Sequence, residues 1–368
     1  MKPTVLQILP ELDCGGVERG TLDVASELVR RGHRSIVISG PGRLVPELID
    51  SGSEHINLPV GKKSLISAVT LIPTLRKLFE EEPIDVIHAR SRLPAWLAYL
   101  AWKKLKPENK PIFITTVHGP YTVNRYSKIM TVGQRVIATS EYIKKYILDN
   151  YPTVDEKNIE VIHRGISRNS YPFKYKPSCD WLTEWNKQYP ELNNKFIITL
   201  PARITRWKGH NDFVDIITRA NTMGLNVHGL IAGGTEPNKE RYLQELKSII
   251  EQNKMGDHFT FAGHRDDMKD IMSISNIVLS LAKIPEAFGR TALEALFLGV
   301  PVIAYDHGGA AEVLSELFPK GKAKPLSVDS VVSLISEFYE TMPEVPERNS
   351  FTLETMLDKT ISIYNSFY

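Results

Sequence analysis

The sequence predicts an α/β protein built from two Rossmann-like, doubly wound halves, and two observations support this prediction. Short apolar runs bounded by turn residues alternate with amphipathic stretches, which is the pattern of βα units and a parallel sheet. The chain has 368 residues, more than a single hydrophobic core usually serves, so two domains are expected. The alternation breaks down once, near 166–195, and then resumes.

The first half begins with a strand at 4–10 and a helix at 17–31, which Gly32 ends. Its further strands are expected at 35–39, 84–88, 112–117, 135–139 and 159–163, with helices near 94–106 and 141–150. The break at 166–195 is rich in Pro, Asn, Tyr and Lys, which predicts a linker.

The second half repeats the pattern after the linker. Its strands are expected at 196–202, 227–233, 259–263, 277–281 and 302–305, with helices near 210–223, 239–254, 267–275 and 290–298. The expected domains are therefore 1–180 and 181–345, followed by a helix in 346–368 that is a candidate to pack across the junction. The active cleft is expected between the facing carboxyl ends of the strands.

Composition excludes several classes of protein. The 45 Lys+Arg against 43 Asp+Glu leave a formal charge of +2, too balanced for a dedicated nucleic-acid binder. The two cysteines, Cys14 and Cys179, are far apart and form no CxxC pair, so neither a disulfide framework nor a zinc site is indicated. No signal-peptide pattern and no run of about 18 apolar residues is present. We therefore expect a cytoplasmic protein without a metal or other cofactor.

The strongest motif pairs Glu286 with Glu294 across the sequence EAFGRTALE. Glu286 is predicted in a loop after a strand, and Phe288 and Gly289 present backbone N–H groups where the next helix begins. Such a helix start can receive a diphosphate, Glu286 can accept hydrogen bonds from sugar hydroxyls, and Glu294 can hold both ribose hydroxyls. The alternative is that Glu286 only satisfies the helix dipole and Glu294 is solvated.

This run closely resembles the E-x7-E motif of glycosyltransferase family 4, and 301–312, PVIAYDHGGAAE, is similar to the family's continuation. The resemblance extends over nearly the whole chain; it departs at 281–284, where many members carry Pro-Ser. It implies the GT-B fold, two facing Rossmann-like domains with an inter-domain cleft. It also implies a retaining transfer of a hexose from a nucleoside-diphosphate sugar, with a UDP- or GDP-sugar as the expected donor.

Two cations, Arg203 and Lys208, follow the first strand of the second half. The resemblance implies that they bind the donor diphosphate, where a leaving nucleoside diphosphate builds up negative charge. No Asp-x-Asp occurs in the sequence, so a metal-independent enzyme is expected. Arg206 is an alternative to either cation, and a basic surface turn is the alternative to the site. Removal of Arg203 or Lys208 is expected to leave stability nearly unchanged.

Further donor contacts come from the resemblance. It implies that the Gly15-Gly16 loop lies over the donor, that His118 contacts the donor sugar near its reacting carbon, and that His264 and Arg265 face the nucleobase through backbone groups. A tight turn is the alternative for the glycines, and a structural role is the alternative for His118. Cys14 is interpreted as a bystander rather than a nucleophile.

Acceptor recognition is expected in the first half, at Arg90, Arg92, Asn124 and Arg125. These residues follow strand ends and mix cations with aromatics, which suits a carbohydrate bearing phosphate or carboxylate. Solvated loops are the alternative. The stretch 96–106, with Trp96, Trp102 and several lysines, predicts a buried helix with a solvated end; the alternative is a stripe that touches the inner face of a membrane.

The sequence thus favours a glycosyltransferase acting on a glycan or lipid-linked acceptor in cell-envelope polysaccharide or lipopolysaccharide synthesis. A nucleotide-sugar 2-epimerase of the same fold is one alternative, and it needs acid–base carboxylates around the sugar carbon. A non-catalytic nucleotide-sugar-binding protein is the other. The retention of Arg203, Lys208, Glu286, Glu294 and His118 argues against it.

Overall fold

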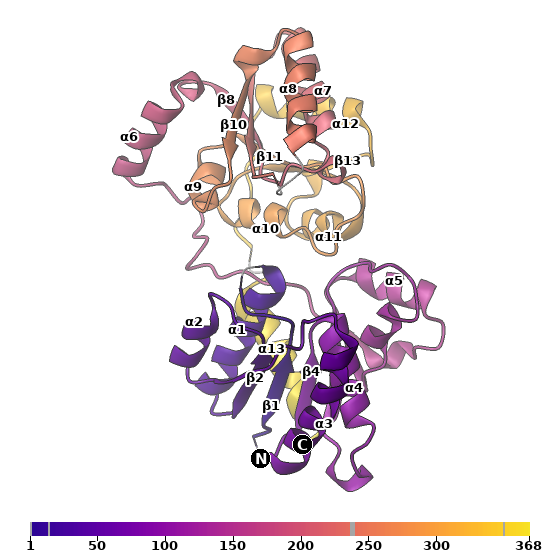
Figure 1. The fold of residues 1–368 in the computed structure, drawn as a ribbon. Helices are drawn as coiled ribbons and strands as arrows, with labels where there is room; N and C mark the ends of the chain where they lie inside the picture. Colours follow the sequence, from indigo (N-terminus) through magenta and orange to yellow (C-terminus); the bar gives the residue numbers. More distant parts are fainter. Residues whose placement is uncertain (1, 14, 236–239, 349) are drawn as a thin grey trace. The chain divides into compact units, whose positions relative to one another are not determined.

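The computed structural model describes residues 2–13, 15–235, 240–348 and 350–368. The chain forms two compact units (Figure 1): unit 1 comprises 1–164 and 354–368, and unit 2 comprises 165–353. The chain thus passes from one unit to the other after residues 164 and 353, whereas the composition predicts boundaries after 180 and 345. The final helix is part of unit 1, and the expectation that the two domains face each other across a cleft remains a prediction.

Unit 1 contains a seven-stranded parallel sheet in the order β3-β2-β1-β4-β5-β6-β7. The strand order reverses between β1 and β4, so the carboxyl ends of these strands form the point where α/β sheets usually bind ligands. Its elements are β1 Val5–Ile8, α1 Gly16–Arg30, β2 Ser35–Ser39, α2 Val45–Asp50, β3 Glu54–Asn57, α3 Leu65–Glu81, β4 Val86–Ala89, α4 Arg92–Trp102, β5 Ile112–Val117, β6 Arg135–Ala138, α5 Glu141–Asn150, β7 Ile159–Val161 and α13 Leu353–Asn365.

The predicted strands of unit 1 are confirmed, and two of the elements that were not predicted, β3 and α3, have a physical reason. β3 has the sequence EHIN and lies at the sheet edge, where its side chains are exposed or half-buried, so it lacks the apolar run that marks the inner strands. α3 carries an internal proline, Pro73, which interrupts the helical pattern in the sequence.

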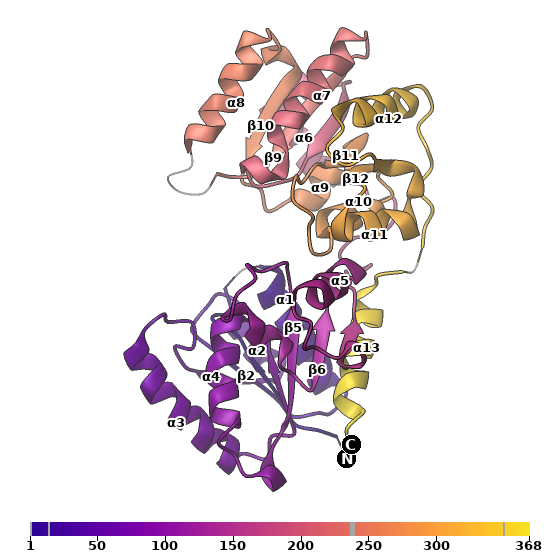
Figure 2. The same ribbon diagram turned by 90° about the vertical axis from the view of Figure 1, so that its right-hand side faces the viewer.

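α13 completes the core of unit 1, lying along its sheet in Figures 1 and 2. Tyr364 of α13 is fully buried, and its hydroxyl lies 2.7 Å from Nδ1 of His88 on β4. The other ring nitrogen, Nε2, lies 2.6 Å from Oγ1 of Thr116 on β5. Polar groups buried in this way need partners, so the three side chains fix α13 in one position on the sheet.

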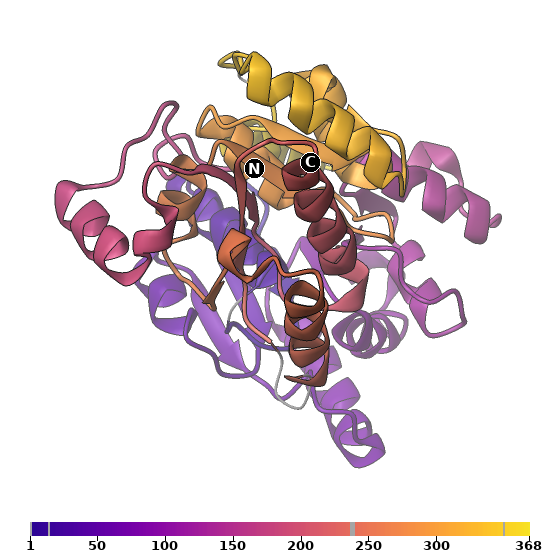
Figure 3. The same cartoon turned by 90° about the horizontal axis from the view of Figure 1, so that it is seen from above.

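Unit 2 contains a six-stranded parallel sheet in the order β10-β9-β8-β11-β12-β13, which reverses between β8 and β11. On this sheet α12 packs beside α7 (Figure 3). Arg219 of α7 pairs with Asp329 of α12 at 2.7 Å. The elements of unit 2 are α6 Cys179–Gln188, β8 Phe196–Leu200, α7 His210–Thr222, β9 Val227–Ala232, α8 Glu240–Gln252, β10 Phe259–Gly263, α9 Met268–Ser273, β11 Ile277–Ser280, α10 Arg290–Phe297, β12 Val302–Tyr305, α11 Gly308–Leu317, β13 Lys322–Ala323 and α12 Val328–Glu340.

The segment expected to be a linker instead contains helix α6. Ser178 caps this helix by accepting a hydrogen bond from the N–H of Trp181 at 3.2 Å. Trp185 is buried between the rings of Trp181 and Tyr189, at centroid distances of 4.9 and 4.5 Å. The polar composition of 166–195 concealed this aromatic face, which belongs to the core of unit 2.

The two ends of unit 2 are paired with each other. Ile166 and Thr352 form a parallel bridge, in which the N–H of Leu353 donates to the carbonyl of Ile166 at 3.0 Å. Gly165 has no room for a side chain, because a Cβ there would lie 2.1 Å from the carbonyl oxygen of Thr352. The chain therefore enters and leaves unit 2 at the same place.

Candidate functional site

In unit 2 the loops after β8 and β11 meet where the strand order reverses. Lys208, from the first loop, forms an ion pair with Glu286, from the second, and each side chain is 19% exposed. Gly209 allows the close approach: its φ is 80°, and a Cβ there would lie 2.1 Å from the carbonyl oxygen of Leu281. The predicted cation and the predicted carboxylate are thus in contact, although they lie 78 positions apart in sequence.

Arg203 lies in the same loop as Lys208, and its residue is exposed. The loop is held against the neighbouring strand end by a hydrogen bond from the N–H of Ile204 to the carbonyl of Gly234, at 3.0 Å. Gly233 leaves no space for a Cβ, which would lie 2.0 Å from the carbonyl oxygen of Ala202. The edge therefore presents two cations on a tightly packed backbone, which suits an anionic ligand.

Helix α10 begins beside this ion pair. Gly289 precedes it with φ 77°, and a Cβ there would lie 2.5 Å from Cα of Ala310. The N–H of Gly309, at the start of α11, donates to the carbonyl of Glu286 at 2.8 Å. Phe288 is buried and packs against Phe351 at a ring distance of 5.7 Å, so only its backbone is available to a ligand.

Glu294 lies one turn into α10 and is 9% exposed, so the alternative of a solvated helix residue is wrong. Its Oε1 accepts a hydrogen bond from Nε of Arg290 at 2.8 Å. Burial, followed by the charge of Glu294, raises the pKa of the Tyr171 hydroxyl. The carboxylate is therefore held in place by its own helix and by a tyrosine.

The loop after β10 carries His264 and Arg265. His264 is exposed, with its Nε2 3.5 Å from a carboxylate oxygen of Asp266. Arg265 donates two hydrogen bonds to Asp267, at 2.8 and 2.6 Å, and these bonds raise its pKa. The guanidinium of Arg265 is thus paired with Asp267. That the backbone of this loop contacts the nucleobase remains a prediction.

In unit 1, helix α1 begins at Gly16, directly after the loop that follows β1. Gly15 has φ 144°, a backbone conformation that favours glycine, and a Cβ there would lie 2.5 Å from Oε2 of the flexible Glu18 side chain. Cys14, which precedes it, lies outside the described residues.

His118 follows β5, and both its backbone and its ring are held. Its N–H donates to the hydroxyl of Tyr121 at 3.3 Å, and Nη2 of Arg164 lies 2.9 Å from Nδ1 of its ring. Burial lowers the pKa of His118 well below 6.5, and the charges of Arg164, Arg90 and then His88 lower it further. The imidazole is therefore neutral at neutral pH.

Known protein families match both units of the chain. Residues 14–169 match the model described as Glycosyltransferase Family 4, and residues 183–351 match Glycosyl transferases group 1. The crystal structure of a glycosyltransferase from Rickettsia africae ESF-5 shares 30% identity and a TM-score of 0.85, covering 99% of this chain and 98% of that one. The chain belongs to glycosyltransferase family 4. Its fold is GT-B.

Two further relatives of this glycosyltransferase are more distant. The structure of Anabaena Alr3699/HepE in complex with UDP-glucose has a TM-score of 0.73 at 19% identity, with 99% of this chain and 95% of that chain covered, a likeness of fold alone. The lipopolysaccharide core biosynthesis mannosyltransferase LpsB of Rhizobium meliloti (strain 1021) is 25% identical over 237 residues, which is 64% of this chain and 63% of LpsB.

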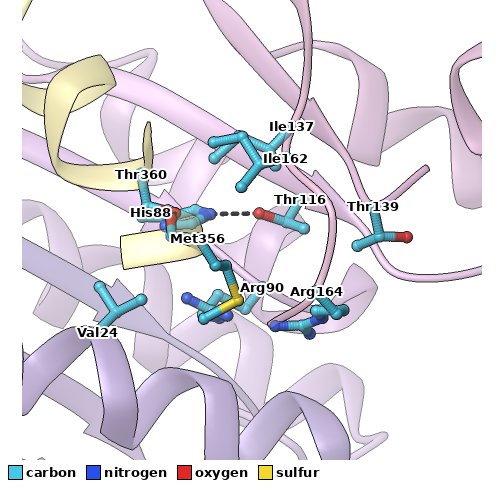
Figure 4. A pocket seen from close by; sticks show the side chains of 10 residues that line it. All are labelled: Val24, His88, Arg90, Thr116, Ile137, Thr139, Ile162, Arg164, Met356 and Thr360. Carbon is cyan, nitrogen blue, oxygen red and sulfur yellow. Dashed lines mark hydrogen bonds between the residues drawn. The ribbon is translucent and has the colours of Figure 1, made fainter. Parts of the chain in front are cut away.

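Arg90 of the glycosyltransferase does not lie in an open loop, as the sequence suggested, because its residue is only 3% exposed. It directly follows β4, and its Nη1 donates to Oε1 of Gln7 on β1 at 2.8 Å. With Arg164 it lines a cavity of about 20 Å³ whose walls also include His88, Thr116 and apolar side chains (Figure 4). A cavity of that size has room for about one water molecule.

The other three predicted acceptor residues surround the loop after β5. The guanidinium of Arg92 lies over the rings of Tyr121 and Tyr126, 4.8 and 5.3 Å from their centroids. Asn124 accepts a hydrogen bond from the N–H of Ser127 at 2.8 Å, which shapes the loop, and Arg125 is exposed. Their role in acceptor binding remains a prediction.

The tryptophans of α4 in the glycosyltransferase turn toward their own unit. Nε1 of Trp96 donates to the carbonyl of Tyr126 at 2.9 Å, and Nε1 of Trp102 donates to that of Pro111 at 2.8 Å. Both contacts favour the buried-helix interpretation over the membrane stripe. Throughout the described ranges, we find no helix whose length and apolar character would let it cross a membrane.

Within the same ranges, no cluster of three or more His, Cys, Asp or Glu side chains could hold a metal ion. Metal independence itself remains a prediction. The sequence interpretation overlooked Arg164, which follows β7 in the run HRGIS, and Gly20 of α1, against which Arg164 lies. A cation next to a glycine at a strand end was the available signal, but their contact with each other and with His118 is visible only in the fold.

Proposed function

We propose that this protein is a retaining, metal-independent hexosyltransferase that uses a nucleoside-diphosphate sugar as donor. The observation that carries the proposal is the Lys208–Glu286 pair at the strand reversal of unit 2. A cation for phosphate and a carboxylate for sugar hydroxyls lie side by side there, with Arg203 in the same loop. That is the chemistry a sugar diphosphate requires.

In this proposal Lys208 and Arg203 neutralise the charge that develops on the β-phosphate as the glycosidic bond breaks. Donor binding frees Glu286 from Lys208, because the diphosphate replaces the carboxylate as the partner of the ammonium group. Glu286 then accepts hydrogen bonds from the sugar, while Glu294 accepts them from the ribose. The acceptor attacks from the face that the diphosphate leaves, and the phosphate takes its proton, so an α-linked donor gives an α-linked product.

For the donor we propose a UDP- or GDP-sugar, bound in the cytoplasm. Alr3699/HepE, which has the same fold, was solved with UDP-glucose. LpsB is described as a mannosyltransferase of lipopolysaccharide core synthesis. We therefore propose a glycan or lipid-linked acceptor of the cell envelope, bound near Arg92 and the loop after β5.

A donor and product assay tests this function. The protein is first screened with UDP-, GDP-, ADP- and CMP-sugars for a rise in melting temperature, since a ligand of the native state raises apparent stability. The donor that stabilises it is then incubated with candidate acceptors in the presence of excess EDTA, and the new linkage is assigned by NMR. An α-linked product supports the proposal. A β-linkage from an α-donor, activity that requires added Mg²⁺ or Mn²⁺, or an epimerised sugar without transfer would each contradict it.

A further inference from the structure

Arg164 and His118 form a contact that fixes where the imidazole carries its proton. Arg164 Nη2 lies 2.9 Å from His118 Nδ1, and a guanidinium can only donate hydrogen bonds. Nδ1 must therefore accept, so the single proton of the neutral ring is on Nε2. Nε2 is buried and has no hydrogen-bond partner among the described residues. A buried N–H without a partner is costly, and a ligand atom would remove that cost.

Helix α1 makes room for the arginine through a missing side chain. A Cβ at Gly20 would lie 2.5 Å from Nη1 of Arg164 and 3.4 Å from Nη2 of Arg90. Both guanidinium groups thus lie against the same point of α1. Figure 4 shows both side chains at the cavity next to His88, and no carboxylate is among the described residues that line it.

The charged and titratable groups next to His118 all oppose protonation of its ring, and the nearby carboxylates act on Arg90 instead. Arg164, after β7, and then Arg90 and His88, of β4 and its end, oppose protonation of the ring. The hydroxyl of Tyr121, in the following loop, accepts a hydrogen bond from the backbone N–H of His118. Glu18 and Asp23 of α1 act on Arg90. Burial and then the charges of Arg164 and Arg90 thus keep the ring neutral, with Nε2–H directed away from Arg164.

We propose that Arg164 is a positioning residue, which holds His118 as the neutral Nε2–H tautomer so that this N–H can donate to an oxygen of the bound substrate. The proposal rests on the proposed function and on the family resemblance, which implies that His118 contacts the donor sugar. Arg164 itself touches no reacting atom in this scheme; it acts through the imidazole.

Three substitutions distinguish the effect of the Arg164–His118 contact on function from an effect on the stability of the protein. Arg164→Met removes the donor and the charge. Gly20→Ala keeps the charge but displaces the guanidinium, and because alanine favours helix formation it should not weaken α1. Arg164→Lys keeps the charge with a different donor geometry and is expected to restore only part of the function. Arg135→Met is the matched control, since Arg135 begins β6, at the opposite end of the sheet, and bonds to the carbonyl of Gln134 at 3.0 Å.

Histidine-selective ¹⁵N NMR reads the ring directly, with His118→Gln to assign its signals. In the wild type we expect the Nε2–H tautomer with no titration between about pH 6 and 8. In Arg164→Met we expect a pKa closer to the ordinary value, because a cation next to the ring is lost. We expect kcat/KM to fall about 10-fold, with kcat affected more than the donor KM, as for a lost charge-assisted hydrogen bond. Gly20→Ala should change both readouts in the same direction, and Arg135→Met should change neither.

A wild-type ring that carries its proton on Nδ1 or is charged at pH 7 would overturn the proposal. So would Arg164→Met and Gly20→Ala variants that match the wild type in either the spectrum or kcat/KM. If no donor and acceptor give turnover, the proposed function fails, while the spectra still decide whether Arg164 sets the state of His118.

Discussion

The two units hold positive charge differently at the point where their strand order reverses. In unit 2, Lys208 pairs with the carboxylate of Glu286 across the edge. In unit 1, Arg90 is buried and bonds to the neutral amide of Gln7, on the neighbouring strand β1. The carboxylate of unit 2 can exchange places with an incoming phosphate. The amide of unit 1 does not neutralise Arg90, so the charge of this arginine adds to the effect of burial, which lowers the pKa of His88 and His118.

The largest expected effect concerns acid, and it should differ between the units. Burial lowers the pKa of His210 and His228 in unit 2 to about 4, and lowers those of His88 and His118 in unit 1 well below 6.5. Below about pH 6.5 the unfolded chain binds protons that the folded chain excludes, so stability falls as pH falls. Each such histidine costs about 1.4 kcal/mol per pH unit in this range.

Urea unfolding at pH 7.5, 6.5 and 5.5 measures this loss. His228→Gln and His88→Gln should each make the dependence shallower by about one proton. The charges of Arg90 and Arg164 add to the effect of burial on the pKa of His88. The loss of stability due to His88 should therefore continue to lower pH than the loss due to His228. A free energy of unfolding that does not change with pH would contradict both statements.

The next largest effect is expected for Lys208→Ala. A charged hydrogen bond is worth about 1.5–3 kcal/mol, so kcat and kcat/KM should fall together by roughly 10- to 200-fold. Steady-state kinetics at saturating donor measures the change. Arg206→Ala is the control, because this neighbouring cation has its own partner, Glu245, and lies over Tyr242. A kcat of Lys208→Ala close to that of the wild type would contradict the proposal that Lys208 binds the donor diphosphate.

The ion pair also changes the expected stability of Lys208→Ala. From sequence, removal of the cation was expected to leave the melting temperature unchanged or slightly higher, since only neighbouring cations were apparent. The structure gives Lys208 a carboxylate partner, so its removal should lower stability, by about 1–3 kcal/mol, because the largely buried Glu286 loses its partner.

A smaller effect is expected for Glu286→Gln. The amide cannot hold Lys208 as the carboxylate does, so the ammonium is available to phosphate without breaking an ion pair. We expect the nucleoside diphosphate alone to bind up to about 5-fold more tightly, as for a pair worth about 1 kcal/mol, while transfer falls. Calorimetry with UDP and GDP measures binding, and Glu245→Gln serves as the control. Weaker diphosphate binding by Glu286→Gln would show that the pair does not compete with the ligand.

The smallest effect is expected for Arg92→Ala, which probes the open part of unit 1. Its guanidinium lies over Tyr121 and Tyr126 of the loop proposed to bind the acceptor, and one exposed charged contact with the acceptor is worth about 0.2–1 kcal/mol. The acceptor KM should rise about 2- to 5-fold with the donor KM unchanged. Arg90→Ala, by contrast, should act first on stability, because it leaves the buried amide of Gln7 without its partner. If Arg92→Ala raised only the donor KM, the assignment would be wrong.

The sequence predicted the position of most strands because their apolar runs are local, and four of them, 35–39, 112–117, 259–263 and 302–305, coincide with the structure. Glu286, Gly289 and Glu294 were predictable for the same reason, since their spacing is read within a single loop and helix. The Lys208–Glu286 pair was not, because it joins residues from two strand ends.

Arg90 shows a second limit of the sequence. Arginine is usually exposed, so it was assigned to an open loop, and only the pairing of β1 with β4 places it against Gln7. Arg164 was overlooked for a related reason. The position of its guanidinium depends on Gly20, 144 positions earlier, and the sequence alone does not show which side chain lies next to a glycine within a helix.

The placement of α13 has a consequence for synthesis on the ribosome. Unit 2 is inserted between β7 and α13 of unit 1, so the ribosome translates 165–353 before the helix that carries Tyr364 emerges. Domains usually fold in the order in which they are made. Here the second unit can finish first, because its two ends close on each other at Ile166 and Thr352. Until then the nascent first unit exposes the sheet face around His88, a surface for chaperones to cover.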